Sequence, residues 1–463
     1  NEVDGRQRQM CIRDRYWQQQ VGSIDNETAH APYNFVPLPE AVFAPPDKAT
    51  YGAKGFPRYD QFREDLHTGY FECALEALTP IYIRGPRRQG EAADSRLRPD
   101  FYAIDKGGGP VLPGSSLRGV IRSLYEVLTF SRVDPVNPQK AGGEVPPDAS
   151  ESDFVAPAEL NTYPGDTGAP DLASRLFGFI SGSDQLRGRL RFTNARYTGG
   201  HNDPYVGILI APKLLLSPHP SSYRMYLVQT SEDPGARRTY RRNRSSGTEI
   251  RGTKFYWHKW DRERGLDSVK MPDTTTESHD KVLSGILNGH PDKTHTAIRC
   301  VREGSKFRFR VYFQNLTDVE LGALSSAILL PPDLAHKFGM GKPLGLGSIE
   351  LKLAQVRIID SRKRCAAWNE TGEAGSEDLL ETAEDAFSDA ILKHCFGKKC
   401  PENLESIWSI PRLSHLESLL TAHTADDLRS VENMDISEFR NAPVLPLASK
   451  VERGATVSLR DGG

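Results

Sequence analysis

The stretch FRFRVYFQNLTDVELGALSSAILL, residues 307–330, contains the patterns that decide the fold of this chain. In its first part, apolar residues occupy every second position: Phe307, Phe309, Val311 and Phe313. The positions between them carry basic or polar side chains: Arg308, Arg310 and Tyr312. Because successive side chains of a strand point to opposite faces, the alternation predicts a strand with an apolar inner face and an arginine-bearing outer face.

A helix is predicted immediately after this strand. Thr317 and Glu320 have the spacing of a capping box, in which each side chain accepts a hydrogen bond from the backbone N–H of the other residue. The stretch HKFGMGKPLGLGSIELKL, 336–353, then forms a glycine-rich turn that enters another strand. The chain therefore runs strand, helix, strand in this region.

The first half of the chain shows a related order. The stretch YFECALEALTPIYI (70–83) is predicted to be a strand, because apolar and acidic residues alternate in it. A helix follows after the turn at Pro113–Gly114, because apolar residues recur at helical spacing: Leu117, Val120, Ile121, Leu124 and Leu128. The next predicted strand is LRGRLRFTNARY (186–197), with Leu186, Leu190 and Phe192 on one side and Arg187, Arg189 and Arg191 on the other. This order favours an α+β fold of ferredoxin-like units with antiparallel sheets.

We divide the chain into three parts. Residues 1–28 form an N-terminal segment, whose first 17 residues, NEVDGRQRQMCIRDRYW, resemble a translated sequencing artefact more than native protein. Residues 29–360 form the core, with a loop insertion at 133–170 and a basic insertion at 231–262. Residues 361–463 are an acidic helical region that ends in a proline-containing tail.

Composition indicates a water-soluble globular protein. Hydrophobic residues make up 38% and charged residues 26% of the 463 positions. The longest apolar stretch, VGILIAPKLLL at 206–216, contains Pro212 and Lys213 and is too short to cross a membrane. We see no secretory leader, so we expect a cytoplasmic protein with no membrane partner.

Charge is segregated along the chain, although the formal net charge is only −2. Residues 366–392 contain eight acidic residues and no Lys or Arg. Residues 237–260 contain eight Arg or Lys residues and only Glu249 as an acid. The local charge, which a polyanion would meet, is therefore strongly positive in the second segment.

The six cysteines are scattered, which argues against a disulfide scaffold. In HCFGKKC (394–400), Cys395 and Cys400 are weak candidates for a zinc site together with His394. Their spacing is not a standard CxxC, and no second pair exists. Ordinary buried thiols are the favoured interpretation, and zinc is the less favoured one.

The stretch PGSSLRGVIR, 113–122, lies at the start of the first predicted helix. Ser115 or Ser116 can cap that helix, and the unpaired amides of the first turn attract anions. Arg118 and Arg122 would add charge-assisted hydrogen bonds to a phosphate. The alternative is an ordinary capped helix with solvated arginines.

A second glycine-rich stretch, GMGKPLGLGS at 339–348, precedes a strand. It is neither a Walker A loop nor a GxGxxG dinucleotide motif. Gly341, Gly345 and Gly347 would let the backbone approach a sugar–phosphate chain, with Lys342 as the cation. A plain flexible turn is the alternative.

The basic segment at 237–260 also contains aromatic residues, as single-stranded RNA recognition requires. The candidate RNA-binding residues in it combine cations with a ring: Arg237, Arg238, Arg241, Arg242, Arg251, Lys254 and Tyr256. The alternative is a basic loop that leads into a hydrophobic strand. We favour RNA binding, because three basic features occur on one chain.

Several stretches together resemble the RAMP superfamily of CRISPR-associated proteins, nearest to the effector backbone group of type III systems: APYNFVPLP, PVLPGSSLRGVIRSL, GRLRFTNA, RGTKFYWHK, FRVYFQNLTDVELGAL and GMGKPLGLGSIEL. The resemblance covers roughly 31–355. It implies an RNA-recognition-motif-like core that binds a CRISPR guide RNA, with complementary target RNA and other CRISPR effector subunits as further partners. It also implies a protruding thumb, which we place in the arginine-rich segment at 231–254.

The resemblance also implies possible cleavage of target RNA. Backbone subunits of this group often use an aspartate before the PGSS helix together with a divalent metal. Asp100 in RPDFYAID matches that aspartate best, so we expect it to be catalytic with Mg²⁺ or another divalent ion. The arginine-rich loop before it departs from the usual glycine-rich run of the family. A loop-capping or salt-bridging carboxylate is the alternative role.

Two other functions remain open. A metal-independent endonuclease that processes guide precursors would need a general base such as His67, His201 or His258 near a Tyr or Lys. No histidine stands in a sequence arrangement that indicates this role. The other is a structural subunit that joins its neighbours and does not cut RNA.

Overall fold

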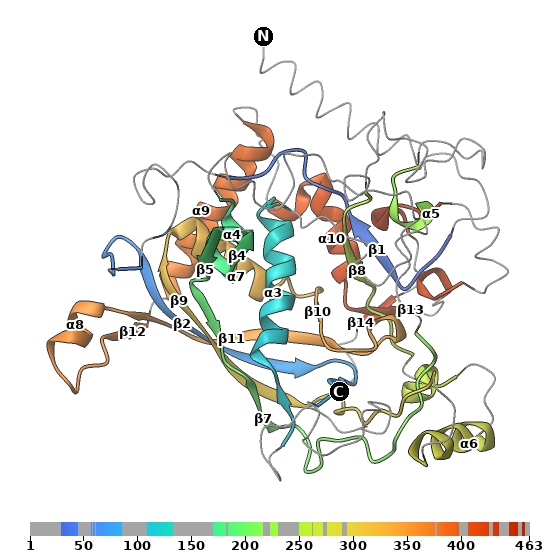
Figure 1. Ribbon diagram of the computed structural model, residues 1–463. Helices are drawn as coiled ribbons and strands as arrows, with labels where there is room; N and C mark the ends of the chain where they lie inside the picture. Colours follow the sequence, from blue (N-terminus) through green and yellow to red (C-terminus); the bar gives the residue numbers. More distant parts are fainter. Residues whose placement is uncertain are drawn as a thin grey trace.

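The computed structural model describes residues 29–44, 57, 59–60, 62–85, 109–132, 170–181, 184–215, 223–229, 250–261, 263–271, 276–288, 294–375, 377–397, 406–425, 429–434, 444–451 and 456–458. These residues form a mixed α+β fold around one curled antiparallel sheet (Figure 1). The expected α+β class is therefore confirmed.

Four strands form the centre of the main sheet, and all neighbours among them are antiparallel. In spatial order they are β11 (Ser348–Ile359), β2 (His67–Ala77), β9 (Lys306–Leu316) and β7 (Ala195–Gly199). The strands predicted at 70–83 and 307–315 are present as β2 and β9. β9 also has the predicted burial, since its four alternating apolar residues lie inside.

Short strands extend this sheet. β10 (His336–Lys337) and β12 (Glu373–Gly375) pair with opposite ends of β11. β6 (Leu190–Phe192) pairs with β9 beside β7, and β3 (Val111–Leu112) pairs with β7.

Two helices connect the central strands. α3 (Gly114–Leu128) lies between β2 and β7 in the chain, and α7 (Asp318–Ile328) lies between β9 and β11. α7 begins at the predicted capping box: Glu320 N–H donates to Thr317 Oγ1 (3.3 Å), and Thr317 N–H donates to the Glu320 carboxylate (3.1 Å). This local prediction is confirmed.

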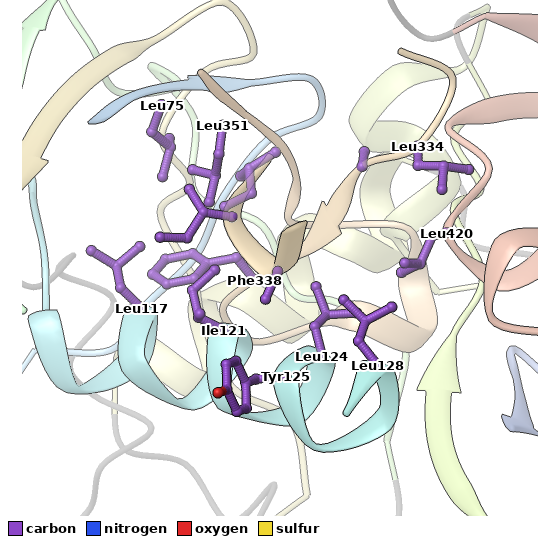
Figure 2. Packing of buried hydrophobic residues seen from close by; sticks show 14 of the residues in the cluster. Leu75, Leu117, Ile121, Leu124, Tyr125, Leu128, Leu334, Phe338, Leu351 and Leu420 are labelled. Atoms are coloured by element: carbon purple, nitrogen blue, oxygen red, sulfur yellow. The ribbon is translucent and has the colours of Figure 1, made fainter. Parts of the chain in front are cut away.

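α3 packs its apolar stripe against the main sheet. Four residues of the predicted stripe are at most 2% exposed: Leu117, Ile121, Leu124 and Leu128. Figure 2 shows Leu117 and Ile121 beside the Phe338 ring, with Leu75 of β2 and Leu351 of β11 beyond it. Each fully buried leucine of this kind contributes roughly 1.5–3 kcal/mol to stability. The helix therefore covers one face of the sheet.

Three further helices contribute to the same apolar core: α4 (Leu172–Phe177), α9 (Glu377–Phe396) and α10 (Pro411–Leu420). α9 lies tightly on α7, because a Cβ added at Gly322 would lie 2.0 Å from the Ala383 carbonyl oxygen. α10 contacts a small sheet made of β1 (Tyr33–Val36) and β8 (Thr253–Tyr256).

The remaining elements lie around this body. β4 (Gly178–Ser181) pairs with β5 (Asp184–Arg187), and β13 (His423–Ala425) pairs with β14 (Thr456–Ser458). The smaller helices are α5 (Tyr223–Tyr226), α6 (Thr276–Leu287) and α8 (Ser361–Ala366). Figure 1 shows α8 and β12 projecting from the body at the left. None of the helices within the described ranges is long and apolar enough to cross a membrane.

The strand predicted at 186–197 is divided. Its first residues belong to the β4–β5 hairpin, and the chain joins the main sheet only at β6. Arg189, which we expected on the outer face, is 4% exposed. It donates a hydrogen bond to the Asn315 carbonyl (2.6 Å) and forms an ion pair with the buried Glu320. The prediction for Arg189 is wrong, because the chain turns between β5 and β6 and buries this guanidinium beside the Glu320 carboxylate.

Candidate nucleic-acid interface

The main sheet has an outer face, which is the face turned away from α3. Leu75 and Leu351 point toward α3 (Figure 2), so their strand neighbours Ala74 and Lys352 belong to the opposite face. The register aligns Lys352 with Ala74, Ala74 with Arg308, and Arg308 with Arg196. The three cations of this row are exposed. The outer face therefore carries a basic row across β11, β2, β9 and β7.

A second row on the outer face combines cations with tyrosine rings. The register aligns Arg357 with Tyr70, Tyr70 with Tyr312, and Tyr312 with Arg191. The two ring centroids are 5.3 Å apart. The Arg191 guanidinium lies 4.6 Å from the Tyr312 centroid, and the Arg310 guanidinium lies 4.7 Å from that of Tyr70. Tyr70 is 5% exposed, whereas Tyr312 is only half-buried, so Tyr312 is the more accessible ring.

Glu72 holds two arginines between these rows. Its carboxylate accepts a hydrogen bond from Arg310 (3.0 Å) and lies 3.5 Å from an Arg308 nitrogen. Hydrogen bonds to Tyr312 and to Glu72 raise the pKa of Arg310 above its ordinary value. This guanidinium is consequently charged at every physiological pH, and both arginines are oriented before any ligand arrives.

An open hollow of about 450 Å³ lies on this face. It is lined by Glu72, Thr193, Asn194, Arg196, Arg308, Phe309, Arg310 and Tyr312. Three guanidinium groups therefore face one carboxylate, and the hollow has a net positive charge. An anionic chain is the ligand that this charge favours.

The PGSS turn lies at the edge of the hollow, but its serines do not cap α3. The helix begins at Gly114 after Pro113, and no side chain caps it. The Gly114 N–H instead donates to Asn194 Oδ1 (2.9 Å), and the Ser116 N–H donates to the Pro113 carbonyl (3.0 Å). The cap predicted at Ser115 or Ser116 is therefore wrong. The turn supports Asn194, which lines the hollow.

Arg118 and Arg122 are used inside the chain. The Arg118 guanidinium donates to the Phe177 carbonyl and lies 5.4 Å from the centroid of the Phe177 ring. Burial lowers its pKa. Arg122 pairs with Glu126 one turn later (2.6 Å). Both side chains therefore have partners inside the chain in this structure, and a phosphate contact by either one stays a prediction.

The glycines of the second loop serve internal packing. We define the glycine loop as residues 339–347. Gly345 and Gly347 have positive φ values of 93° and 80° and are buried. A Cβ would lie 2.3 Å from the Lys259 carbonyl oxygen at Gly345, and 1.8 Å from that of Phe338 at Gly347. The protein's own backbone thus occupies the side-chain positions of both glycines, and the expected approach of a sugar–phosphate chain to them stays a prediction. Gly341 also has a positive φ of 72°, and it is half-buried.

Three lysines lie in or next to the glycine loop, and we call them the lysine cluster: Lys259, Lys337 and Lys342. Lys337 is 7% exposed and donates to the Gly345 carbonyl (3.1 Å) and to Ser348 Oγ (3.0 Å). Burial, with repulsion from Lys259 and Lys342, lowers the pKa of Lys337 well below its ordinary value.

The charges of the other two lysines, Lys259 and Lys342, have little compensation from groups of opposite charge. Burial lowers the pKa of Lys259 to about 8, and its nearest carboxylate, Glu432, lies 4.0 Å away. Burial also lowers the pKa of Lys342, which has no hydrogen bond or ion pair through its side chain with any residue in the described ranges. A phosphate oxygen would compensate these charges, so Lys342 stays a candidate RNA contact.

The basic aromatic segment is folded inward where the structure describes it. Arg251 is 4% exposed and donates to the Pro446 carbonyl (3.1 Å), and burial lowers its pKa to about 10. Arg251 is therefore used inside the chain in this structure, and the RNA contact expected there stays a prediction. β8, which follows Arg251, pairs with β1 and contacts α10 of the C-terminal region.

Lys254 and Tyr256 form part of a tyrosine cage. Lys254 Nζ lies 3.5 Å from the Tyr33 ring centroid and 5.2 Å from that of Tyr256, and it donates to the Tyr226 hydroxyl (3.1 Å). Burial lowers the pKa of Lys254 to about 8. These rings already stack on a cation of the protein, and the expected contacts of Lys254 and Tyr256 with RNA stay predictions.

Several predicted residues lie outside the described ranges: Asp100, Arg237, Arg238, Arg241, Arg242 and Cys400. Cys395 is half-buried, and its neighbour His394 lies with Nε2 3.2 Å from the Ala41 carbonyl oxygen. Within the described part of the chain, no three His, Cys, Asp or Glu side chains come together as a metal site. Because Asp100 and Cys400 lie outside these ranges, a divalent ion at Asp100 and a zinc ion at Cys395 and Cys400 stay predictions.

The three histidines weighed as general bases have other partners. His67 lies 2.7 Å from Asp318, and His201 lies 2.6 Å from the Glu303 carbonyl oxygen. His258 is 1% exposed and bridges Ser348 Oγ (2.9 Å) and the Ala335 carbonyl (3.0 Å). His258 thus joins the polar network that fixes the glycine loop.

Sequence reasoning did not select the outer-face residues as a site, although it placed Arg308, Arg310 and Tyr312 on the solvent side of their strand. It also missed Arg196, Tyr70 and the positioning role of Glu72. The alternation in β2 and β9 was the available signal, because two neighbouring strands with a buried face must present their other residues together.

Comparison with known families agrees with this architecture. Residues 74–350 match the model of the RAMP superfamily, and they make up more than half of the chain. The match runs from β2 through α3, β7, β9 and α7 to the start of β11. The chain therefore belongs to the RAMP superfamily, whose members work with RNA and other subunits in CRISPR complexes. A search among curated proteins finds no match.

Proposed function

We propose that this chain is a guide-RNA-binding backbone subunit of a type III CRISPR ribonucleoprotein effector, and that RNA crosses the outer face of its main sheet. The observation that carries the proposal is the pair of rows on that face, one basic and one with cations flanking tyrosine rings. Membership of the RAMP superfamily supports the same class of ligand.

We also infer that the core is ferredoxin-like and related to the RNA recognition motif. The chain order β2, α3, β7, β9, α7, β11 and the spatial order β11–β2–β9–β7 support this assignment. Because α3 covers the opposite face, the outer face is the broad surface of the sheet that the described residues leave open to a ligand (Figure 1).

The two rows suit different parts of a nucleotide. Lys352, Arg308 and Arg196 provide charges over about 14 Å, given a strand spacing near 4.8 Å. Cations so arranged neutralise phosphates, whereas an accessible ring such as Tyr312 stacks on a base. Lys342 in the glycine loop is a second proposed contact for RNA.

Filter binding of guide RNA at several salt concentrations tests the proposal. The double variant Arg196→Ala/Arg308→Ala should bind more weakly and should reduce the slope of log K against log salt by about 1.4, which is about 0.7 for each lost single-strand phosphate contact. Lys281→Ala on the distant, exposed face of α6 is the matched control and should leave the slope unchanged. An unchanged slope in the double variant would exclude the outer face as the RNA track.

Cleavage of target RNA by Asp100 stays a prediction, because that residue lies outside the described ranges. The proposal is therefore stated for RNA binding, which the outer face supports by itself.

A further inference from the structure

A carboxylate lies among the cations of the outer-face hollow. Glu72 is the one acid among the described residues that line it, and three of the others are arginines. Its side chain is 20% exposed, so a ligand in the hollow can reach it. Because a carboxylate repels phosphate, it weakens a surface that binds RNA through the backbone alone. The hollow therefore fits a ligand that also donates hydrogen bonds.

Glu72 has acceptor capacity left for such donors. Two neighbouring N–H groups of Arg310, on Nε and on a terminal nitrogen, converge on one carboxylate oxygen, Oε2 (3.2 and 3.0 Å). Within the described ranges no group donates a hydrogen bond to the other oxygen, Oε1, which lies 3.5 Å from an Arg308 nitrogen. A carboxylate oxygen has about two lone-pair sites. Oε1 can therefore accept two neighbouring N–H groups of a ligand, as Oε2 already does from Arg310.

Arg310 places further donors beside this oxygen. A guanidinium has more N–H groups than the hydrogen bonds to Glu72 and Tyr312 use. Arg310 can thus donate to an acceptor that lies next to the donors bound by Oε1. Tyr312 also lines the hollow, and its half-buried ring offers a surface on which a flat base packs. The hollow consequently combines an acceptor, a neighbouring donor and a ring.

Guanine is the RNA base whose edge complements this combination. Its N1–H and its exocyclic N2 amino group are neighbouring donors, and O6 beside them is an acceptor. Adenine and cytosine place a ring-nitrogen acceptor next to their amino group, and uracil flanks its N3–H with two carbonyl oxygens. Each of these acceptors would meet the Glu72 carboxylate and be repelled by it. Oε1 of Glu72 and the Arg310 guanidinium therefore favour guanine over the other three bases.

Two other groups are poorer ligands for Glu72. A ribose 2′-hydroxyl donates a single hydrogen bond and leaves the second site of Oε1 unused. A lysine or arginine of a protein partner would supply donors, but Arg196, Arg308 and Arg310 repel a further cation in the hollow. A nucleobase supplies the donors without a positive charge, and the phosphates attached to its nucleotide compensate the arginines.

We propose that the hollow is a guanine subsite within the RNA-binding face. Guanine N1–H and N2–H donate to Glu72 Oε1, Arg310 donates to O6, and the base packs against Tyr312. Arg196 and Arg308 bind the flanking phosphates, as in the proposed function, on which this inference rests. It goes beyond that function, because it assigns the face a preference among RNA sequences.

Fluorescence anisotropy with short RNAs of alternating sequence tests the subsite. Wild type should bind UG repeats about tenfold more tightly than UA or UC repeats, the usual discrimination of one bidentate contact. Repeats of uridine and inosine are the sharpest comparison, because inosine retains O6 and N1–H but lacks the N2 amino group. They should bind about fivefold more weakly than UG repeats. Equal affinities for these two RNAs, at a salt slope that still depends on Arg196 and Arg308, would overturn the subsite alone. Absence of binding to every RNA would overturn the proposed function as well.

Glu72→Gln separates base recognition from the positioning of the arginines. Loss of the charge and of one acceptor should reduce the preference for UG over uridine–inosine repeats to below about twofold, without weakening the binding of UC repeats. The matched control is Glu76→Gln: Glu76 lies on the same face of β2, pairs with Lys306 (3.8 Å) and does not line the hollow, so the preference should remain. A Glu72→Gln variant that binds all RNAs more weakly and keeps the preference would also overturn the proposal, because Glu72 would then act only by orienting Arg308 and Arg310.

Discussion

The outer sheet face and the glycine loop both combine cations with features typical of RNA binding, yet the fold exposes one and buries the other. On the outer face, Arg196 and Arg308 are exposed and border an open hollow. At the glycine loop, Gly347 closes on Phe338, and Lys337 is enclosed in hydrogen bonds. The difference teaches that alternation in a strand fixes which side chains face solvent, whereas glycine richness marks close packing of backbone as readily as a ligand site.

The largest effect on stability is expected at Gly347. A substitution there tests whether this glycine is needed because neighbouring backbone leaves no room for a side chain. Gly347→Ala places a Cβ 1.8 Å from the Phe338 carbonyl oxygen at a φ of 80°, so the backbone must shift. We expect a loss of roughly 3 kcal/mol or more in the free energy of unfolding, measured by urea denaturation.

Gly119 of α3 is the matched control for this substitution. It lies in open space, with no atom within 4 Å of an added Cβ. Gly119→Ala should stabilise the protein by about 0.5–1 kcal/mol, since alanine suits a helix interior better than glycine does. Equal urea midpoints for the two variants would contradict the packing role assigned to the glycine loop.

The sequence predicts those structural features that depend on residues close together in the chain. The alternation of β9 and the capping box of α7 involve residues at most a few positions apart, and both are present as expected. Other features depend on partners far away in the chain, which local patterns do not reveal. Asn194, eighty positions away, supplies the acceptor at the start of α3 in place of a serine. Arg251 looks like a basic surface residue until β8 pairs with β1 and encloses it.

The candidate site shows the same limit. A single strand pattern places Arg308 outside, but only the register aligns it with Arg196 and Lys352 from other strands. The sequence contains no direct signal for that alignment, because it depends on strand order. The charge segregation noted in the sequence is real, yet burial decides which of those charges a ligand meets.

A smaller effect, on RNA affinity, distinguishes the tyrosines of the outer face from those of the cage around Lys254. Tyr312→Ala removes the accessible ring of the outer face and should weaken RNA binding by about 1–3 kcal/mol, the usual contribution of one stacked base. Tyr312→Phe should retain most of the affinity, since the ring remains. Tyr256→Ala disturbs the cage around Lys254 and should reduce thermal stability while leaving the affinity of the folded fraction unchanged. If Tyr256→Ala weakens RNA binding as much as Tyr312→Ala, the cage and not the sheet face contacts RNA.

The smallest effect is a pH dependence that originates in the lysine cluster. Burial lowers the pKa of Lys259 from an ordinary value of 10.5 to about 8 in the folded protein. Between these two values the unfolded state binds a proton that the folded state does not bind, so the free energy of unfolding rises with pH. Below pH 8 both states are protonated, and Lys259 contributes no slope. Tyr33, whose pKa burial raises, acts in the opposite sense only near pH 10 and above.

Urea denaturation between pH 7.5 and 9 measures this contribution. The free energy of unfolding of wild type should rise over that interval, and Lys259→Met should reduce the rise by about 1 kcal/mol because the shifted group is absent. Lys281→Met, which replaces an exposed lysine, should retain the wild-type profile. A profile in Lys259→Met identical to wild type would mean that Lys259 is solvated like an outer-face cation. The contrast between the two regions would then fail at this residue.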